Sequence, residues 1–214
     1  MKDILDNIKH GRNEFENTQL EGIDGTDPFL LFEKWLTNAV EKSEREPNAF
    51  TLSTVDQNFQ ATARIVYLKD IIDKQFVFYT NYLSKKAMDV AQNPRISMLF
   101  FWPLISRQIR IIGLCTKVDE SISDAYFNSR SRSSQIGAWA SKQSEELEDR
   151  AQLEKRVREY EMKFTNHVPR PPHWGGYKIK PVSFEFWQGR SSRLHDRLVF
   201  ELTGDNWKIH KKNP

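Results

Sequence analysis

The 214-residue sequence has a single cysteine, no long apolar run and almost no excess of one charge. Cys115 cannot form an internal disulfide and lacks the partner ligands of a zinc site, so a reducing cytoplasm is expected. The longest uncharged stretch, 96–106, is shorter than the ~20 residues of a membrane helix and contains Pro103, which predicts no membrane span. Asp3 and Asp6 lie where a secretory signal would be apolar, so we expect a protein that is not exported.

Positive and negative charges nearly cancel. The 32 Lys and Arg against 29 Asp and Glu leave a formal charge of +3. A nucleic-acid-binding barrel would need a contiguous cationic face with exposed aromatic platforms, so we expect no nucleic acid partner and no membrane partner. A colourless protein with salt-sensitive oligonucleotide binding is the alternative. The 14 Phe, 6 Trp and 6 Tyr are sufficient for a sizeable core.

The common catalytic signatures are absent as well. The sequence has no GxGxxG or GxxxxGK[ST] phosphate loop, no HExxH and no GxSxG. Its five histidines, at positions 10, 167, 173, 195 and 210, lie too far apart in the sequence for a local metal cluster. No metal is therefore expected.

The length fits one large domain with an extension. Residues 1–26 are polar and lack a clear period, which predicts a mobile N-terminal arm, and residues 27–214 then form the single domain. Asp27 followed by Pro28 is typical of a helix start, and this helix should end before Pro47. Its predicted apolar stripe consists of Phe32, Trp35, Leu36, Ala39 and Val40.

Short β-rich runs separated by turns follow the first helix. The predicted strands are 50–56, 60–71, 75–81, 95–102 and 107–119. One short helix, capped by Ser84, interrupts them and ends before Pro94. The last run carries apolar side chains on both faces, at Ile109, Ile111, Ile112 and Leu114. We therefore expect a mainly β fold with flanking α-helices, its sheet closed into a barrel or covered by a partner subunit.

Helices and three further strands are expected in the C-terminal half. Residues 121–164 have helical spacing, and the charged run 145–161 is typical of a solvated helix face. Residues 167–181 are punctuated by Pro and Gly and predict a connector. The last strands are predicted at 183–189, 197–203 and 207–211, the final two joined by a turn at 203–206.

Two segments place cations where an anion could bind. Arg64 and Lys69 are five residues apart in one predicted strand, so their side chains should point to opposite faces and serve two different anions. An ordinary surface strand with two solvated charges is the alternative. Ser84, Lys85 and Lys86 combine a hydroxyl and two ammonium groups with a helix N-terminus, which favours a phosphate site.

Tyr126, Arg130 and Ser134 are spaced to project from one helical face and could hold a second phosphate. Solvent-facing polar residues on a helix would look the same.

Near the C-terminus, Arg193, His195 and Arg197 should share one strand face. Three potential cations side by side repel unless an anionic or π-rich group lies across them. Trp187 could pack against a flat ring, although a buried Trp is the commoner outcome.

Taken together, these segments resemble the pyridoxamine 5′-phosphate oxidase family of FMN enzymes. The matching runs are RIVYLK, FYTN with SKKA, NPR with RQIRIIG, YFNSRSRSSQIGAWASKQS, PPHWGGY, and FWQGRSSRLHDR with WKIHKKNP, in unbroken order from about residue 27. The resemblance implies an FMN-binding split β-barrel that forms a homodimer, with FMN at the subunit interface.

The resemblance also implies roles for individual residues. The FMN phosphate would be bound by Arg64, Lys86, Lys85 and Thr80. The rest of the cofactor would contact Tyr79, Gln108, Gln143, Ser144, Trp187 and Arg197, with Lys69 and the backbone of Val66 and Leu68 beside it. The substrate phosphate would be bound by Lys69, Tyr126, Arg130 and Ser134. Arg193 and His195 would be the catalytic residues, lying over the pyridine ring on the face opposite the flavin.

Two departures from the family pattern concern binding. Lys85 stands where the family has arginine, so a point charge replaces a bidentate group. In the N-terminal arm, Arg12 would contact the substrate, with Phe15 in place of the family's tyrosine.

The implied reaction is the oxidation of pyridoxamine and pyridoxine 5′-phosphate to pyridoxal 5′-phosphate, with dioxygen as acceptor and hydrogen peroxide as product. The alternative is a non-catalytic flavin or pyridoxal-phosphate binding protein on the same fold.

Overall fold

The computed structural model describes residues 27–214. The expected N-terminal arm and Arg12 lie outside the described residues. The described part divides into two compact units. Unit 1 comprises 27–47, 99–111 and 183–214, and unit 2 comprises 48–98 and 112–182. The prediction of a single domain over 27–214 stays a prediction.

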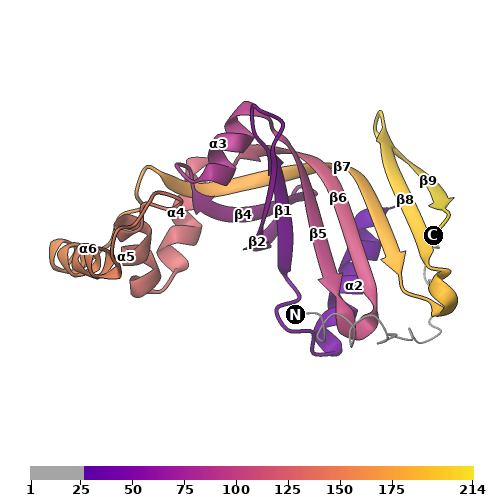
Figure 1. Ribbon diagram of the computed structural model, residues 1–214, viewed down its shortest axis with the longest axis horizontal. Helices are drawn as coiled ribbons and strands as arrows, with labels where there is room; N and C mark the ends of the chain where they lie inside the picture. Colours follow the sequence, from indigo (N-terminus) through magenta and orange to yellow (C-terminus); the bar gives the residue numbers. More distant parts are fainter. Residues whose placement is uncertain (1–26) are drawn as a thin grey trace, which may run out of the picture. The chain divides into compact units, whose positions relative to one another are not determined.

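The elements confirm a mainly β fold with flanking helices (Figure 1). The strands are β1 Ala49–Val55, β2 Ala61–Tyr67, β3 Asp70–Ile72, β4 Gln75–Asn81, β5 Arg95–Trp102, β6 Arg107–Lys117, β7 Trp174–Gln188, β8 Asp196–Thr203 and β9 Asn206–Lys212. The helices are α2 Pro28–Glu41, α3 Lys85–Gln92, α4 Glu120–Ser129, α5 Arg132–Ala140 and α6 Arg150–Lys163, with 3-10 turns at Pro103–Ile105 and Ser191–Arg193. The strand order is β2-β1-β5-β6-β7-β4-β3, and β8 pairs with both β7 and β9.

Helix α2 anchors the core of unit 1. Asp27 accepts a hydrogen bond from the Phe29 amide at 2.9 Å, as the predicted cap requires. The rings of Phe32 and Trp35 pack edge-on against Phe100 and Phe186, each at 5.2 Å between centroids.

The predicted stripe of α2 is wrong at one position. Val40 is 58% exposed, whereas Leu31 is buried. The buried face follows Leu31, Phe32, Trp35 and Ala39, so Val40 lies further round the helix from the core.

The predicted strand 60–71 is two strands, because the chain changes its pairing partner in the middle. Residues 61–67 pair with β1, and the Leu68 amide then bonds to the Asn48 carbonyl at 2.9 Å. The next amide, that of Lys69, bonds to the Val77 carbonyl of β4 at 2.9 Å. The regular alternation of side chains therefore ends at Tyr67.

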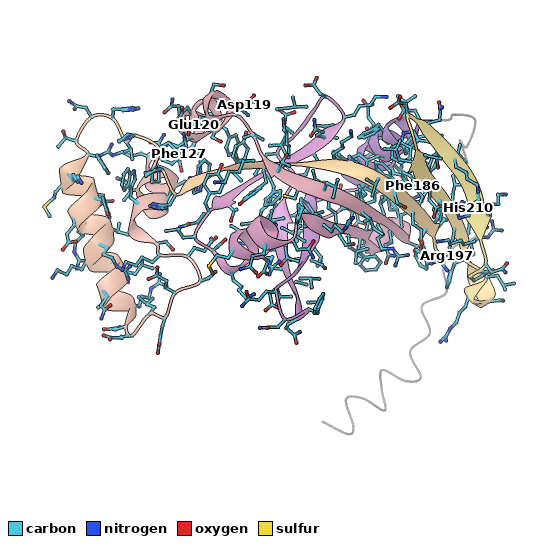
Figure 2. The ribbon with its side chains drawn as sticks, turned by 90° about the horizontal axis from the view of Figure 1, so that it is seen from above. Asp119, Glu120, Phe127, Phe186, Arg197 and His210 are labelled. Atoms are coloured by element: carbon cyan, nitrogen blue, oxygen red, sulfur yellow. The ribbon has the colours of Figure 1, made fainter. Side chains whose placement is uncertain are left out.

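The predicted helical region 121–164 contains three helices with two interruptions. The first interruption is at Arg130, which ends α4, and Ser131 then caps α5. The second is the segment 141–149, which lies between α5 and α6. Helix α6 has no fully buried residue, which confirms the solvated face. Its partly buried side of Val157 and Tyr160 packs against a core cluster in unit 2 that includes Phe127, labelled in Figure 2.

The predicted connector 167–181 is wrong from Trp174 onward, where β7 begins. Gly175 and Gly176 pair with β4 and leave room for aromatic side chains. A Cβ at Gly175 would lie 2.2 Å from the Tyr82 hydroxyl, and one at Gly176 would lie 2.8 Å from the Tyr79 ring. The two glycines therefore mark close packing within a strand rather than a turn.

The predicted C-terminal hairpin is confirmed. Thr203 at the end of β8 pairs with Asn206 at the start of β9, and Gly204 has a φ of +61° in the turn between them.

The strand β6 has one face that residues 27–214 leave partly exposed. Cys115 is buried, whereas Ile112 is 45% exposed and Leu114 is 39% exposed. Apolar side chains thus lie on both the buried and the exposed face of β6, as predicted. The exposed face is available for a partner subunit. Within residues 27–214, no helix combines the length and the apolar character that crossing a membrane requires.

Candidate functional site

Unit 2 contains a cavity of about 710 Å³ that gathers most of the residues singled out from the sequence. The predicted residues that line it are Arg64, Val66, Lys69, Tyr79, Thr80, Lys86, Tyr126, Arg130, Ser134 and Gln143. They come from β2, the segment after it, β4, α3, α4, α5 and the loop after α5. Members of both predicted phosphate-binding sets therefore line one cavity.

Lys86 lies at the start of α3 with its ammonium group among neutral acceptors. Its Nζ donates to Thr80 Oγ1 at 3.1 Å, Ser84 Oγ at 3.2 Å and Gln143 Oε1 at 2.9 Å. Burial, together with the positive charge of Arg64, lowers the pKa of Lys86 to about 8. The positive charge of Arg64 acts on Lys86, and no carboxylate from the described residues is among the hydrogen-bond partners of Lys86. This end of the cavity is therefore suited to a phosphate.

Arg64 is held from behind by strand β1 and its own neighbour. Its Nη1 donates to Thr54 Oγ1 at 2.7 Å and to the Leu52 carbonyl at 3.2 Å, and its Nη2 donates to Thr62 Oγ1 at 2.6 Å. Burial lowers the pKa of Arg64, and the nearby charge of Asp89 opposes that effect. The guanidinium is thus fixed before any ligand binds.

Lys85 does not join Arg64 and Lys86 in the cavity lining. Its ammonium binds Asp89 at 2.5 Å and Asp56 at 3.3 Å. The predicted convergence of Ser84, Lys85 and Lys86 on one anion therefore differs from the structure, because Lys85 has carboxylate partners of its own. Likewise, the Ser84 side chain makes no capping hydrogen bond to α3.

The second set surrounds Arg130, but not on one helical face as predicted. Tyr126 belongs to α4 and Ser134 to α5, and the break at Arg130 separates them. Ser131, at the start of α5, donates to Ser134 Oγ at 2.9 Å, and both serines line the cavity. Arg130 Nη1 is buried without a hydrogen-bond partner among the described residues. An oxyanion would satisfy this group.

A stack of aromatic rings forms part of the cavity lining. Tyr79 stacks on Tyr126 at 3.9 Å and on Trp174 at 5.5 Å, with interplanar angles of 10° and 8°. The Arg130 guanidinium lies 4.6 Å from the centre of the Trp174 ring. Burial raises the pKa of Tyr79 to about 12, so its hydroxyl is protonated at neutral pH.

Lys69 lines the same cavity as Arg64. The prediction that the two point to opposite faces is wrong, because the strand ends at Tyr67 and the alternation does not continue to Lys69. Some lining residues had no predicted role, namely Ile65, Tyr67, Asn81, Ser131, Gly137, Ala138, Ser141 and Trp174. Trp174 could have been identified from the sequence, since it directly precedes the Gly-Gly pair in PPHWGGY, one of the runs that match the family.

The remaining predicted residues lie elsewhere. In unit 2, Leu68 is buried and neither it nor Ser144 lines the cavity. Unit 1 contains Gln108, Trp187, Arg193, His195 and Arg197. Of these, His195 and Arg197 line a cavity of about 480 Å³ together with the C-terminal residues 211–214.

Arg193, His195 and Arg197 do not share one strand face. Arg193 ends a 3-10 turn with a φ of +60°, and β8 begins only at Asp196. Arg197, labelled in Figure 2, is held by the buried carboxylate of Glu185 through contacts of 2.9 to 3.1 Å. The charge of Arg197 is thus balanced by a buried acid.

His195 lies in a defined local environment. Its ring centre is 4.6 Å from that of Trp187, and its Nδ1 accepts a hydrogen bond from the Arg190 amide at 3.1 Å. Burial, together with the charge of Arg193, lowers the pKa of His195 below its usual range. At neutral pH the imidazole is therefore neutral, with its proton on Nε2.

Two family models match the sequence. Residues 36–164 match the model described as pyridoxamine 5′-phosphate oxidase, and residues 174–214 match the one described as the pyridoxine 5′-phosphate oxidase C-terminal dimerisation region.

Curated relatives carry the corresponding name. The chain is 51% identical over 189 residues to a pyridoxine/pyridoxamine 5′-phosphate oxidase of Cupriavidus necator, covering 88% of this chain and 89% of the relative. It is 46% identical over 204 residues to the protein of that name from Acaryochloris marina, covering 95% and 93%.

Solved structures share the fold. PhzG from Burkholderia lata 383, in complex with tetrahydrophenazine-1-carboxylic acid, superposes with a TM-score of 0.88 at 30% identity, covering 94% of this chain and 100% of that one. A pyridoxamine 5′-phosphate oxidase-related, FMN binding protein from Nostoc punctiforme gives a TM-score of 0.69 at 16% identity, covering 86% and 97%, and supports the fold alone. The predicted FMN-binding split-barrel fold is thereby confirmed. The chain belongs to the pyridoxine/pyridoxamine 5′-phosphate oxidase family.

Proposed function

We propose that this protein uses FMN to oxidise pyridoxamine 5′-phosphate and pyridoxine 5′-phosphate to pyridoxal 5′-phosphate, in the supply of vitamin B6. One observation carries the proposal: a single cavity is lined by two separate cationic groups, Arg64 with Lys86 and Arg130 with its serines. A phosphorylated flavin and a phosphorylated substrate together need two such groups.

The first group fits the FMN phosphate. The guanidinium of Arg64 is oriented by two threonine hydroxyls, and the ammonium of Lys86 is surrounded by neutral oxygens of Thr80, Ser84 and Gln143. A dianion placed there would relieve the repulsion between the two cations. When bound, FMN supplies a two-electron acceptor that takes a hydride and passes the electrons to dioxygen.

The second group fits the phosphate of the substrate. Arg130 offers its Nη1, which has no hydrogen-bond partner within residues 27–214, and Ser131 and Ser134 offer hydroxyls at the start of α5. Tyr126 and Lys69 complete this set. The role of these residues is to fix one end of the substrate, so that the carbon to be oxidised is held within about 3 to 3.5 Å of the flavin.

The family resemblance supports roles for five further residues. Arg193 and His195 would lie over the pyridine ring on the face opposite the flavin. Arg193 contributes a positive charge, and the neutral imidazole of His195 carries its proton at Nε2, where it can donate to a ring substituent. Gln108, Trp187 and Arg197 would contact the cofactor.

We infer that the active form is a homodimer. The match of residues 174–214 to a dimerisation region and the exposed Ile112 and Leu114 on β6 support this assembly. The FMN sites would lie at the subunit interface.

The atoms of the reaction balance with dioxygen as the oxidant. Pyridoxamine 5′-phosphate, water and dioxygen give pyridoxal 5′-phosphate, ammonia and hydrogen peroxide. Pyridoxine 5′-phosphate and dioxygen give the same aldehyde and hydrogen peroxide.

The visible spectrum of the purified protein tests the proposal. We expect a yellow protein that bleaches when pyridoxamine 5′-phosphate is added without oxygen, and that releases peroxide when air is admitted. Unphosphorylated pyridoxamine is the matched control and should bleach the protein far more slowly. A yellow protein that the phosphorylated amine does not bleach would support the carrier alternative, and a colourless protein that FMN does not reconstitute would refute flavin chemistry altogether.

A further inference from the structure

Asp89 is a buried carboxylate next to the cavity, on helix α3, which lies against β1 (Figure 1). It is 2% exposed and does not line the cavity. One oxygen, Oδ1, accepts from Lys85 Nζ at 2.5 Å, and the other, Oδ2, accepts from Thr54 Oγ1 at 2.7 Å and from Thr62 Oγ1 at 3.4 Å. Both oxygens are therefore in use as acceptors.

The threonine hydroxyls that reach Asp89 are the same ones that hold Arg64. A hydroxyl has one proton to donate. Because Thr54 donates its proton to Asp89, it presents a lone pair to Arg64 Nη1, which lies 2.7 Å away. The hydrogen bonds thus run in one direction, from Arg64 through Thr54 to Asp89, and the carboxylate fixes their polarity.

The other oxygen of Asp89 determines where Lys85 points. The ammonium of Lys85 is bound by Asp89 and by Asp56, and Lys85 is absent from the cavity lining. Of the cations Arg64, Lys85 and Lys86, the first and the third line the cavity and Lys85 does not.

We propose that Asp89 is a positioning residue for the phosphate site, and that it acts on the ligand through Thr54 and the guanidinium of Arg64 without touching it. The identity of the ligand, a phosphorylated flavin, rests on the proposed function. A carboxylate is needed because an amide accepts at only one oxygen. An asparagine at this position would either face Lys85 with an N–H group or reverse the hydrogen bond of Thr54, which would turn its proton toward Arg64.

The experiment compares FMN with riboflavin, which lacks only the phosphate. Two apoproteins are titrated with each flavin: the single variant Asp89→Asn, and the double variant that combines Asp89→Asn with Lys85→Gln. The double variant is needed because the Lys85 ammonium, once Asp89 no longer binds it, could compensate for a misoriented Arg64 guanidinium. We expect affinity for FMN to fall about tenfold in both variants, with affinity for riboflavin unchanged.

Two further variants separate positioning from structure. Thr54→Val keeps the shape of the side chain and removes the bridging hydroxyl, so it should reproduce the selective loss of FMN affinity even if Asp89→Asn folds poorly. Asp56→Asn is the matched control, since the Asp56 carboxylate also binds Lys85 while its other hydrogen bonds go to the amides of Asn58 and Gln60, and it should leave both affinities unchanged.

The outcomes are distinguishable. An equal loss of FMN and riboflavin affinity in Asp89→Asn and Thr54→Val would mean that Asp89 only supports the fold, and would overturn the inference. The inference would also be overturned if adding Asp89→Asn to Lys85→Gln left the affinity for FMN unchanged or increased it. A wild-type protein with no preference for FMN over riboflavin would instead overturn the proposed function.

Discussion

The low pKa of Lys86 predicts that the protein loses affinity for FMN as the pH rises above about 8. The pKa is lowered from 10.5 to about 8 by burial and by the positive charge of Arg64. A phosphate dianion favours the protonated ammonium, so FMN binding takes up a proton wherever free Lys86 is neutral. Full affinity is therefore present below about pH 8 and is lost above it.

The size of the effect follows from the fraction of Lys86 that is protonated in the apoprotein. With a pKa of about 8, this fraction is about nine-tenths at pH 7 and about one-tenth at pH 9. If the bound phosphate returns the pKa of Lys86 toward its ordinary range, the apparent affinity for FMN falls about tenfold between pH 7 and pH 9.

Fluorescence titration of the apoprotein with FMN from pH 7 to 9 measures this slope. Riboflavin is the control for ionisation of the flavin ring and should show no such slope. Lys86→Arg is the control for the assignment, because a guanidinium stays charged and should bind FMN with little dependence on pH. A slope that riboflavin shares, or one that survives in Lys86→Arg, would refute the role given to Lys86.

Three further substitutions test the other parts of the site and the fold. Arg130→Met should raise the KM for pyridoxine 5′-phosphate about 10- to 100-fold, because one charge-assisted phosphate contact is lost, and the FMN content should stay intact. Loss of FMN from the purified variant would contradict the separation of the two phosphate sites. Arg193→Ala should lower turnover far more than FMN retention, and an equal loss of both would reject its place over the substrate ring. Gly113→Ala should destabilise the protein by about 1 to 3 kcal/mol in chemical denaturation, since its Cβ would lie 2.7 Å from the Lys180 carbonyl oxygen; wild-type stability would show that β6 and β7 can separate without cost.

Features of the fold that depend on neighbouring residues were predictable from the sequence. The cap at Asp27, the strand runs and the turn at 203–206 each follow from a few consecutive residues. The break after Tyr67 was not predictable in this way, because the chain there leaves β1 for β4, and its amides bond to Asn48 and Val77. No residue inside the run 60–71 signals that exchange.

The residue types of the site were predictable, but the geometry that unites them was not. Tyr126, Arg130 and Ser134 line one cavity although the helix between them is broken at Arg130. Side-chain periodicity assumes an unbroken element, so it gives the wrong face wherever the chain bends. Lys85 shows the complementary limit. Its position beside Lys86 at a helix start indicated a ligand contact, whereas its ammonium binds Asp56 and the buried Asp89.

The environment of Arg130 favours an enzyme over a flavin carrier. A buried guanidinium nitrogen without a hydrogen-bond partner costs about 1 to 3 kcal/mol or more, and Arg130 Nη1 is in this position among the described residues. A carrier that bound FMN through Arg64 and Lys86 would have no use for a second cation, and a methionine packed against Trp174 would avoid the cost. The arrangement is understandable if a second anion enters the cavity in each catalytic cycle, because the lost stability is then recovered as binding energy that fixes the substrate beside the flavin.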